Sequence, residues 1–484
     1  MSPVLILLLF LAYTALLFFV TWLTARKSNN ETFFIGNKVS PWYVVAYGMI
    51  GASLSGVTFM SVPGWVKDTQ FSYMMVVFGY LFGYLVITLV LLPLYYRLNL
   101  TSIYSYLEGR FGWYTHKTGA GFFLISRILG ASLRMFLVVD VLQEFVFKAW
   151  HIPFWVNVLM FITLIILYTF KGGIKTIVWT DTLQTTFMLL AVILSIVFIC
   201  NQMHVGIWEM VSSIWHSKTS QIIVTDWHSR QFYLKQFFSG MFITIVMTGL
   251  DQEMMQKNLS CRNLKDAQKN MTTFSFTLIF VNFIFLFLGA VLLLYAHANS
   301  ISIIKTDDLF PTIAMKYLSP VAGIVFLIGL ISAAYPSADG ALTSLTTTFC
   351  IDFLNFDKKP HLSEQQKIRT RYIVHLSVAA IFLVVIIIFR AVNNEAVIDK
   401  LFTIAGYTYG PLLGFYSFGL FTKLQVKDKW VPIVAIASPV ICFVLSEFSE
   451  KLLFGYKFGF ELLILNGLLT FFGLLILARN SETN

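Results

Sequence analysis

Two arginines, Arg127 and Arg134, lie inside an apolar stretch that runs from about 118 to 148. A charge in such surroundings is costly, so it is a functional candidate by default. Seven residues are about two helical turns, which places both arginines on nearly the same face of a helix. Either guanidinium could bind a solute carboxylate or several hydroxyls through paired hydrogen bonds. The alternative is an internal ion pair with Asp140 or Glu144 of the same stretch.

Two aspartates also accompany apolar stretches. Asp339 lies well inside the stretch from about 319 to 353, which is rich in serine and threonine. Carboxylate and hydroxyl oxygens are hard ligands, suited to an alkali cation rather than to a soft transition metal. The alternative for Asp339 is pairing with an arginine. Asp181 opens the stretch from about 177 to 201, where an acid near a helix N-terminus is also ordinary.

A third feature is the interrupted stretch from 42 to 63, WYVVAYGMIGASLSGVTFMSVP. It is long enough to cross a bilayer, but glycine, serine and threonine in its middle disfavour a uniform helix. We therefore expect a break between Gly51 and Gly56. Freed carbonyl groups at mid-membrane would bind a small cation, and the hydroxyls beside them would suit a polar solute. The alternative is an unbroken helix whose small residues pack closely on a neighbour.

The composition defines the class of protein that must position these groups. Of the 484 residues, 57% are hydrophobic and 12% are charged, which predicts an all-α protein with many transmembrane helices. The net charge of +10 needs no nucleic-acid partner, because loop arginines and lysines account for it. The four cysteines are far apart and predict neither a disulfide framework nor a zinc site. No phosphate-binding Walker A pattern occurs, so direct use of ATP is not expected.

Hydropathy predicts about 13 transmembrane helices. The first, from Pro3 to Thr24, has basic residues after it and none before it, which favours a retained helix over a cleaved signal peptide. The others are predicted at about 42–66, 72–96, 118–148, 154–170, 177–201, 236–256, 272–298, 319–353, 370–390, 397–422, 431–447 and 458–478.

The basic residues predict the orientation of this bundle. With the N-terminus outside, 21 of the 34 lysines and arginines fall in the inner loops, which include Arg26 and Lys27, and 11 fall in the outer loops. Such a bias is typical of loops that remain in the cytoplasm. We therefore expect a multi-pass protein of the inner (plasma) membrane, surrounded by lipid, with its N-terminus outside and its C-terminus in the cytoplasm.

Six stretches make the chain resemble the sodium:solute symporter family, which includes bacterial sodium/galactose, sodium/proline and sodium/sialic acid transporters. In chain order they are GASLSGVTFMSVP (51–63), TSIYSYLEGRF (101–111), GGIKTIVWTD (172–181), GLDQEMMQKNLSCRNLKDAQK (249–269), SADGALTSLTTTF (337–349) and GPLLGFYSFGLFTK (410–423). The resemblance implies a LeuT-type core of two inverted five-helix repeats. The implied division is an extra helix and loop at 1–40, repeats at 41–202 and 236–424, an outer loop at 203–235, and two extra helices at 425–484.

The resemblance also implies a sodium site between the broken helix and the hydroxyl-rich one. Its ligands by position are the carbonyl groups of Gly51, Leu54 and Ala333 and the hydroxyl of Ser337. Pro336 stands where the family has a further hydroxyl. Some relatives hold a second sodium ion, for which Asp181 matches one ligand. We predict that Asp339 replaces the missing serines there, so that one or two sodium ions bind.

The solute pocket implied by the resemblance lies beside the sodium site. Its expected residues are Ser53, Ser55 and Thr58 of the broken helix, Thr403 of a later helix, and Arg134 in preference to Arg127. The predicted function is sodium-coupled import of a small polar solute, a sugar, a sialic acid or a related organic acid, by alternating access and as a monomer. A proton-coupled transporter is the nearest alternative. An intramembrane enzyme is a remote one, since the sequence has no cluster of nucleophile and base.

Overall fold

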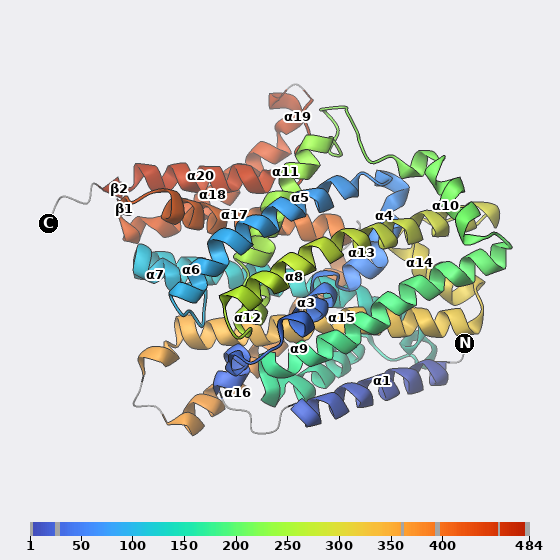
Figure 1. Cartoon of the computed structure of the whole chain (residues 1–484), viewed down its shortest axis with the longest axis horizontal. Coiled ribbons are helices and arrows are strands. Elements are labelled where there is room, and N and C mark those ends of the chain that lie inside the picture. Colours follow the sequence, from blue (N-terminus) through green and yellow to red (C-terminus); the bar gives the residue numbers. More distant parts are fainter. Residues whose placement is uncertain (1–2, 25–29, 360–362, 393–396, 454, 480–484) are drawn as a thin grey trace.

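The computed structural model describes residues 3–24, 30–359, 363–392, 397–453 and 455–479. Long apolar helices run along the longest axis of the molecule, and the two ends of the chain lie at opposite ends of that axis (Figure 1). The main helices are α1 (Pro3–Thr24), α3 (Trp42–Ser53), α4 (Gly56–Thr69), α5 (Tyr73–Val86), α8 (Trp113–Phe145), α9 (Phe154–Met203), α11 (Tyr233–Thr244), α12 (Gln252–Leu259), α13 (Leu264–Ala298), α15 (Pro320–Thr348), α16 (Glu364–Val392), α17 (Val397–Phe421), α18 (Val431–Glu447) and α20 (Leu462–Ile476).

Short elements join these helices. They are α2 (Asn30–Ile35), α6 (Leu92–Arg97), α7 (Ser105–Arg110), α10 (Ile207–Trp215), α14 (Leu309–Thr312) and α19 (Ser449–Leu452). The strands β1 (Gln425–Val426) and β2 (Ala478–Arg479) pair antiparallel after α17 and α20. Three further segments are used below: the π-helices η5 (Ile245–Gly249) and η8 (Phe349–Phe353), and the 3₁₀ turn η6 (Thr306–Asp308).

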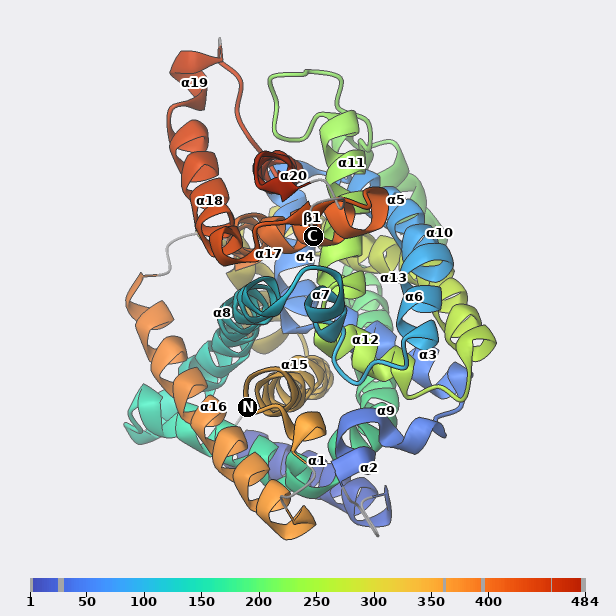
Figure 2. The same cartoon turned by 90° about the vertical axis from the view of Figure 1, so that its left-hand side faces the viewer.

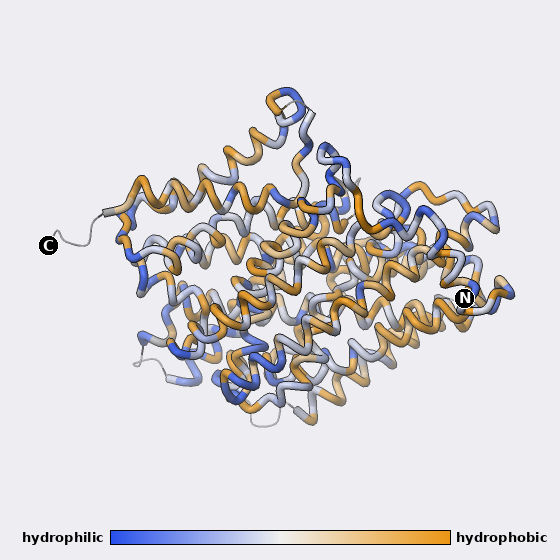
Figure 3. The backbone as a smooth tube through the Cα atoms, turned by 45° about the horizontal axis from the view of Figure 1, so that its top comes forward, coloured by the Kyte–Doolittle hydropathy of each residue, from blue (hydrophilic) through white to orange (hydrophobic). Residues whose placement is uncertain are grey.

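The lengths and the apolar composition of the helices are those of a membrane protein. Within the described residues, eight helices are long and apolar enough to cross a bilayer, or nine if α3 and α4 count as one bent span. Hydrophilic residues gather toward the ends of the helices and hydrophobic residues along their lengths (Figure 3). In α1, α16 and α18, a third or less of the most apolar window is buried within the protein. These helices therefore present their apolar side chains outward.

The helix break predicted between Gly51 and Gly56 is confirmed. Helix α3 ends at Ser53, α4 begins at Gly56, and the two differ in direction by 55°. The last carbonyl groups of α3 and the first amides of α4 thus lack partners within their own helices. This is the arrangement in which backbone oxygens become available to a ligand.

Two other departures from straight helices bear on the predicted spans. The spans expected at 154–170 and 177–201 are two helices, Phe154–Phe170 and Gly173–Met203, which follow one another within α9 and are joined by a kink at Gly173 in the left-handed region (φ 51°). The span expected at 236–256 is broken, because η5 ends at Gly249 and α12 begins at Gln252. Asp251 accepts hydrogen bonds from the amides of Glu253 and Met254 and so caps α12.

Helix α15 lies at the centre of the packing. Viewed end-on in Figure 2, it is surrounded by α1, α8, α9, α12 and α16. From Phe326 onward nearly every residue of α15 is buried, including its serines and threonines. The helix runs without interruption through Pro336. Its polar side chains therefore face other helices, and α3 and α4 are among its contacts.

Candidate functional site

A small cavity lies at the break between α3 and α4; we call it the central cavity. Its volume is about 80 Å³. Of the residues expected to bind solute, Ser53, Ser55, Thr58 and Arg134 line it. Further polar side chains come from α5, η5 and α13, and the sequence analysis named none of them: Tyr73, Tyr80, Tyr84, Thr248 and Asn282.

The structure separates the two arginines of α8. Arg127 forms ion pairs with Glu253 and, at 3.6 Å, with Asp251. Its partners therefore come from the capped turn of α12. The alternative of an internal ion pair is met for this arginine, but with these residues rather than with Asp140 or Glu144. Glu144 instead pairs with the exposed Lys148, just beyond the end of α8.

Arg134 is buried to the same degree but has no carboxylate partner among the residues that the structure describes. It is 8% exposed, and its Nε has no hydrogen-bond acceptor within the described part of the chain. A buried guanidinium without an anion is costly. Since this one lines the central cavity, the cavity favours an anionic ligand.

Of the residues expected to hold sodium, Ala333 lies at the break between α3 and α4, since its carbonyl oxygen would be 3.9 Å from a Cβ atom on Gly56. Ala333 and Ser337 are completely buried on α15, which packs against α3 and α4. The Ser337 hydroxyl has no partner among the described residues. The Gly51 amide, in contrast, has a partner, because it donates a hydrogen bond to the Thr185 hydroxyl at 3.0 Å. Oxygen donors with no hydrogen bonds of their own fit a sodium ion by their chemistry.

Asp181 has a partner that the sequence analysis did not foresee. Lys257 of α12 lies 2.6 Å from its carboxylate, and each side chain is 1% exposed. Lys257 also lies 3.5 Å from Glu253. Lys257 was one of the 21 basic residues that the sequence placed in inner loops, and that prediction is wrong for this residue, because its ammonium group is buried among carboxylates on α12. The signal in the sequence was the run DQEMMQK, whose charges follow an apolar stretch directly.

Asp339 is completely buried on α15 and accepts a hydrogen bond of 2.7 Å from the Tyr168 hydroxyl. Among the residues that the structure describes, its other oxygen has no hydrogen-bond partner, and neither has the hydroxyl of Thr343 one turn further on. The alternative of an arginine partner is not met within the described residues. A buried carboxylate oxygen beside a free hydroxyl is a place where a monovalent cation or a proton would be stabilised.

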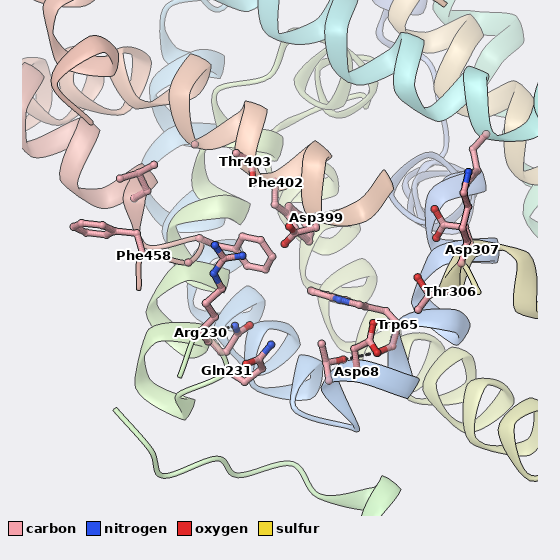
Figure 4. A pocket seen from close by; sticks show the side chains of 18 of the residues that line it. Trp65, Asp68, Arg230, Gln231, Thr306, Asp307, Asp399, Phe402, Thr403 and Phe458 are labelled. Atoms are coloured by element: carbon pink, nitrogen blue, oxygen red, sulfur yellow. Dashed lines mark hydrogen bonds between the residues drawn. The ribbon is translucent and has the colours of Figure 1, made fainter. Parts of the chain in front are cut away.

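A larger cavity, with a volume of about 740 Å³, lies next to the central cavity. We call it the outer vestibule, and the names outer and inner follow the orientation that the basic residues predict. Thr403 lines this vestibule and not the central cavity, whereas its neighbour Phe402 lines both. Trp65, Arg230 and Phe458 come from three separate segments around the same space (Figure 4). The aromatic ring of Phe402 thus marks the passage between the two cavities.

The opposite end of the bundle is held by residues 101–112, which we call the inner segment. Asp352 of η8 is completely buried and accepts a hydrogen bond of 2.5 Å from Ser102. His116, at the start of α8, contacts the same carboxylate at 2.8 Å. Lys117 donates to the backbone oxygen of Asp352. One carboxylate thus links the inner segment, α8 and the end of α15.

The inner segment is also tied to α17 and α12. Arg110 donates to three carbonyl oxygens at and beyond the end of α17, those of Gly419 (3.2 Å), Thr422 (2.8 Å) and Leu424 (3.0 Å). The Tyr416 hydroxyl donates to the carbonyl of Ile103 at 2.8 Å, and Gln252 bonds to the backbone of the same segment. The motif TSIYSYLEGRF therefore closes one end of the molecule.

Comparison with known proteins identifies the class that this fold and site define. The model of the sodium:solute symporter family matches residues 33–425. The chain belongs to this family, and it is a sodium-coupled solute symporter. Similar proteins include the sodium/sialic acid symporter SiaT of Proteus mirabilis, 23% identical over 91% of this chain and 88% of the relative, and the sodium/sialic acid symporter NanT of Aliivibrio fischeri, 24% identical over 92% and 88%.

Solved structures confirm the predicted fold class. A substrate-bound, outward-open Na⁺-coupled sialic acid symporter superimposes with a TM-score of 0.83 at 19% identity, over 98% of each chain. The nucleobase-cation-symport-1 family transporter Mhp1 superimposes with a TM-score of 0.57 at 13% identity, over 93% of this chain and 95% of that one. The chain is thus an all-α, multi-pass membrane transporter with the LeuT-type arrangement, and sodium is its coupling ion.

Proposed function

We propose that this protein imports a small polar organic solute, a sugar, a sialic acid or a related organic acid, together with sodium and by alternating access. The observation that carries the proposal is the central cavity, where a helix break, hydroxyl groups and the unpaired Arg134 meet. The sialic acid symporters among the similar proteins support an acidic solute. Within the cavity, Ser53, Ser55 and Thr58 are the proposed hydroxyl contacts, with Thr403 acting from the vestibule.

The proposed sodium ligands are the carbonyl groups of Gly51, Leu54 and Ala333 and the hydroxyl of Ser337. The helix break frees backbone carbonyls on one side, and α15 supplies a hydroxyl without a hydrogen-bond partner on the other. Sodium bound there would hold the two halves of the broken helix against α15. That fixes the walls of the solute cavity, so each ligand favours binding of the other.

A second monovalent cation is proposed at Asp339. This carboxylate has one oxygen on Tyr168 and one without a partner, and it has no described counter-ion. Asp181, the other expected ligand, already contacts the Lys257 ammonium. A second ion would therefore bind mainly to Asp339, with Asp181 contributing only if Lys257 moves away.

The transporter is proposed to act as a monomer in the inner (plasma) membrane, with the vestibule facing outward and the inner segment in the cytoplasm. The basic residues support this orientation, since Arg110 and Lys117 lie at the end of the molecule that the inner segment closes. Arg26 and Lys27, two of the basic residues used in the prediction, fall outside the described residues. In that orientation one positive charge crossing 100 mV releases about 2.3 kcal/mol. This energy corresponds to about fortyfold accumulation when one net positive charge enters with each solute, which for a monocarboxylate takes two sodium ions, before the sodium gradient is counted.

Replacement of Ser337 by alanine tests the assignment of the sodium site. We expect uptake into proteoliposomes to need a higher sodium concentration, by about tenfold, because one ligand of a buried cation is lost. Ser332, on the same helix but bonded to a backbone carbonyl, provides a matched control in Ser332→Ala. An unchanged sodium requirement in Ser337→Ala would show that the ion binds elsewhere.

Coupling to protons is the second candidate, and the unpartnered oxygen of Asp339 is the observation that favours it. The same proteoliposomes separate the two. Uptake that persists when potassium replaces sodium, but stops when an uncoupler is added, would support proton coupling. Uptake that requires sodium and tolerates the uncoupler, with the membrane potential set by potassium, supports sodium coupling.

A further inference from the structure

Helix α17 runs as one continuous helix through a proline, Pro411. Proline has no amide hydrogen, so the carbonyl group of Tyr407, four residues earlier, loses its usual donor within the helix. The proline ring also pushes this carbonyl group away from the helix axis. Helices kink readily at such positions. Pro411 therefore lies at a hinge between the outer part of α17, residues 397–410, and its inner part, residues 412–421.

A side chain of α20 replaces the missing donor. The amide nitrogen of Asn466 donates to the carbonyl oxygen of Tyr407 at 2.9 Å and to that of Gly406 at 3.0 Å. Asn466 is completely buried in an otherwise apolar helix, LLILNGLLTFFGLLI, where a polar side chain is costly. Its side-chain oxygen has no donor among the described residues. A residue kept only to fill space would avoid this cost, so the two donated hydrogen bonds account for the asparagine.

Glycines in α17 let α20 come close enough for these bonds. Gly406, Gly410 and Gly414 are spaced by four residues and so lie on one face of α17. A Cβ atom on Gly410 would collide with the Asn466 side chain, and one on Gly414 would collide with Thr470. The two helices lie side by side (Figure 2) and pack through small residues, as is common in membranes. The hydrogen bonds of Asn466 thus belong to a close helix contact.

The segment before α20 also reaches the passage between the two cavities. The ring of Phe460 lies 4.7 Å from that of Phe402 and 6.1 Å from that of Trp65. Residues 460–476 therefore contact α17 twice, at the hinge and at the passage. They lie beyond residues 33–425, the part of the chain that the family model matches.

We propose that Asn466 is a positioning residue for transport: it holds α17 straight at Pro411, so that the outer and inner parts of this helix move together. Its hydrogen bonds limit how far the outer part, with Phe402, bends over the central cavity. The consequence for transport rests on the proposed alternating access, in which closing of the vestibule must open the inner end. The hinge itself depends on neither the solute nor the sodium site.

Hydrogen–deuterium exchange of the purified protein, in sodium chloride without solute, measures the bending. Asn466→Leu keeps the branching of the side chain and removes both donors. We expect the amides of residues 397–410 to exchange about three- to tenfold faster, the value of an interhelical hydrogen bond from a polar side chain in a membrane. Unchanged exchange in these residues overturns the inference.

Thr470→Val is the matched control. Thr470 lies one turn further along α20, and its hydroxyl donates to Ser438 of α18 and to a carbonyl group of its own helix. This variant should leave the exchange of residues 397–410 within about twofold of the original protein. Equal acceleration in Asn466→Leu and Thr470→Val would mean that any loosening of α20 frees α17, which contradicts a specific role of Asn466.

A second variant separates the lost donor from lost packing. Pro411→Ala restores the backbone amide that the Tyr407 carbonyl lacks, so adding Asn466→Leu to it should change the exchange of residues 397–410 by less than about twofold. Lost packing around Asn466 would instead accelerate exchange equally with and without Pro411→Ala. That equal acceleration overturns the inference even if every variant folds.

The same measurements distinguish this inference from the proposed function. Sodium, in place of potassium, should slow exchange at residues 51–58 if the proposed sodium site is correct, and it should do so in Asn466→Leu as well. Exchange there that is indifferent to sodium would contradict the sodium site. The hinge is decided separately, by whether Asn466→Leu accelerates exchange at residues 397–410 and Pro411→Ala removes that acceleration.

Discussion

The outer and inner ends of the helix bundle are built differently. At the outer end, a vestibule of about 740 Å³ separates α4, α17 and the segment before α20. At the inner end, Asp352, Arg110 and Tyr416 join the inner segment to α8, α15 and α17 through short hydrogen bonds. Helix α17 takes part in both regions: Thr403 near its start lines the vestibule, and the carbonyl groups near its end accept from Arg110.

This difference shows which contacts must change during transport. Alternating access requires each end to open while the other is closed. The structure is open at the vestibule, so the next state must break the ties of the inner segment and bring α17 toward α4. Since α17 contacts both regions, a rotation of this one helix could weaken the inner ties while it narrows the vestibule.

Between the two ends lies a layer of buried charges. Arg127, Lys257, Asp251 and Glu253 link α8 to the capped turn of α12, and Asp181 links that turn to α9. The layer lies between the central cavity, which Arg127 lines, and the inner segment, which Gln252 contacts. We expect this layer to couple ligand binding in the central cavity to the hydrogen bonds that hold the inner segment.

Of the changes considered, replacement of Lys257 by methionine should have the largest effect, and it should destabilise the charge layer next to the inner end. It leaves Asp181 buried without its counter-ion, which costs about 3 to 5 kcal/mol. We expect thermal unfolding at a markedly lower temperature, and partial recovery as sodium rises and neutralises Asp181. Unfolding of detergent-purified protein across a sodium series measures both effects.

The matched control is the double variant Asp181→Asn with Lys257→Met, which removes both charges. It should recover most of the lost stability and lose the added sodium response. If the single and double variants unfold alike, the 2.6 Å contact between Lys257 and Asp181 does not stabilise the inner half.

Replacement of Arg110 by alanine should have the next largest effect, confined to the inner end. It removes hydrogen bonds from a charged donor to three carbonyl groups, but Arg110 is only partly buried, so the three bonds together contribute about 1.5 to 3 kcal/mol. We expect the inner segment to open more often. Cys261 and Cys350 are completely buried in this half, so their faster labelling by a thiol reagent measures the opening.

Lys358→Ala is the control for Arg110. Lys358 pairs with Glu108 of the same segment at 2.5 Å, but its side chain is 62% exposed. Exposed pairs contribute about 1 kcal/mol or less, so this variant should leave the labelling of both cysteines nearly unchanged. Equal labelling in the two variants would mean that Arg110 is not what closes the inner end.

The sequence predicted the broken helix well and the charge layer poorly, for a physical reason. Glycine and serine at 51–56 act locally, through the backbone preferences of their own segment, so the break could be read directly. The pairing of Lys257 with Asp181 joins residues 76 positions apart. Hydropathy assigns Lys257 to a loop because it scores each residue by its own polarity. It carries no information about a distant carboxylate that pairs with a buried ammonium group.

The two arginines of α8 illustrate the same limit. Their seven-residue spacing correctly placed both on the cavity side of one helix. It could not tell which one pairs internally, because that depends on the second break, at residues 250–251, which the hydropathy pattern concealed. An aspartate followed two positions later by glutamate is a helix-start signal, and in GLDQE it would have predicted that break.

Replacement of Asp307 by asparagine should have the smallest effect, and it acts at the outer end. Asp307 in η6 accepts a hydrogen bond of 3.0 Å from the amide of Val397, the first described residue of α17. Burial raises the pKa of Asp307, although the hydrogen bond from the Val397 amide lowers it. The folded protein therefore holds this proton more readily than the unfolded chain does.

The sign of the pH effect follows from that difference. As pH rises from the ordinary carboxyl range near about 4 through the raised pKa, the unfolded chain loses its proton first, so the contribution of Asp307 to stability falls. Asp307→Asn cannot titrate, and it should unfold with a shallower dependence on pH, the difference remaining at about 1 kcal/mol. Thermal unfolding of both proteins between pH 4 and 7 measures it. Parallel profiles would mean that the carboxyl of Asp307 titrates in the folded protein as it does in the unfolded chain.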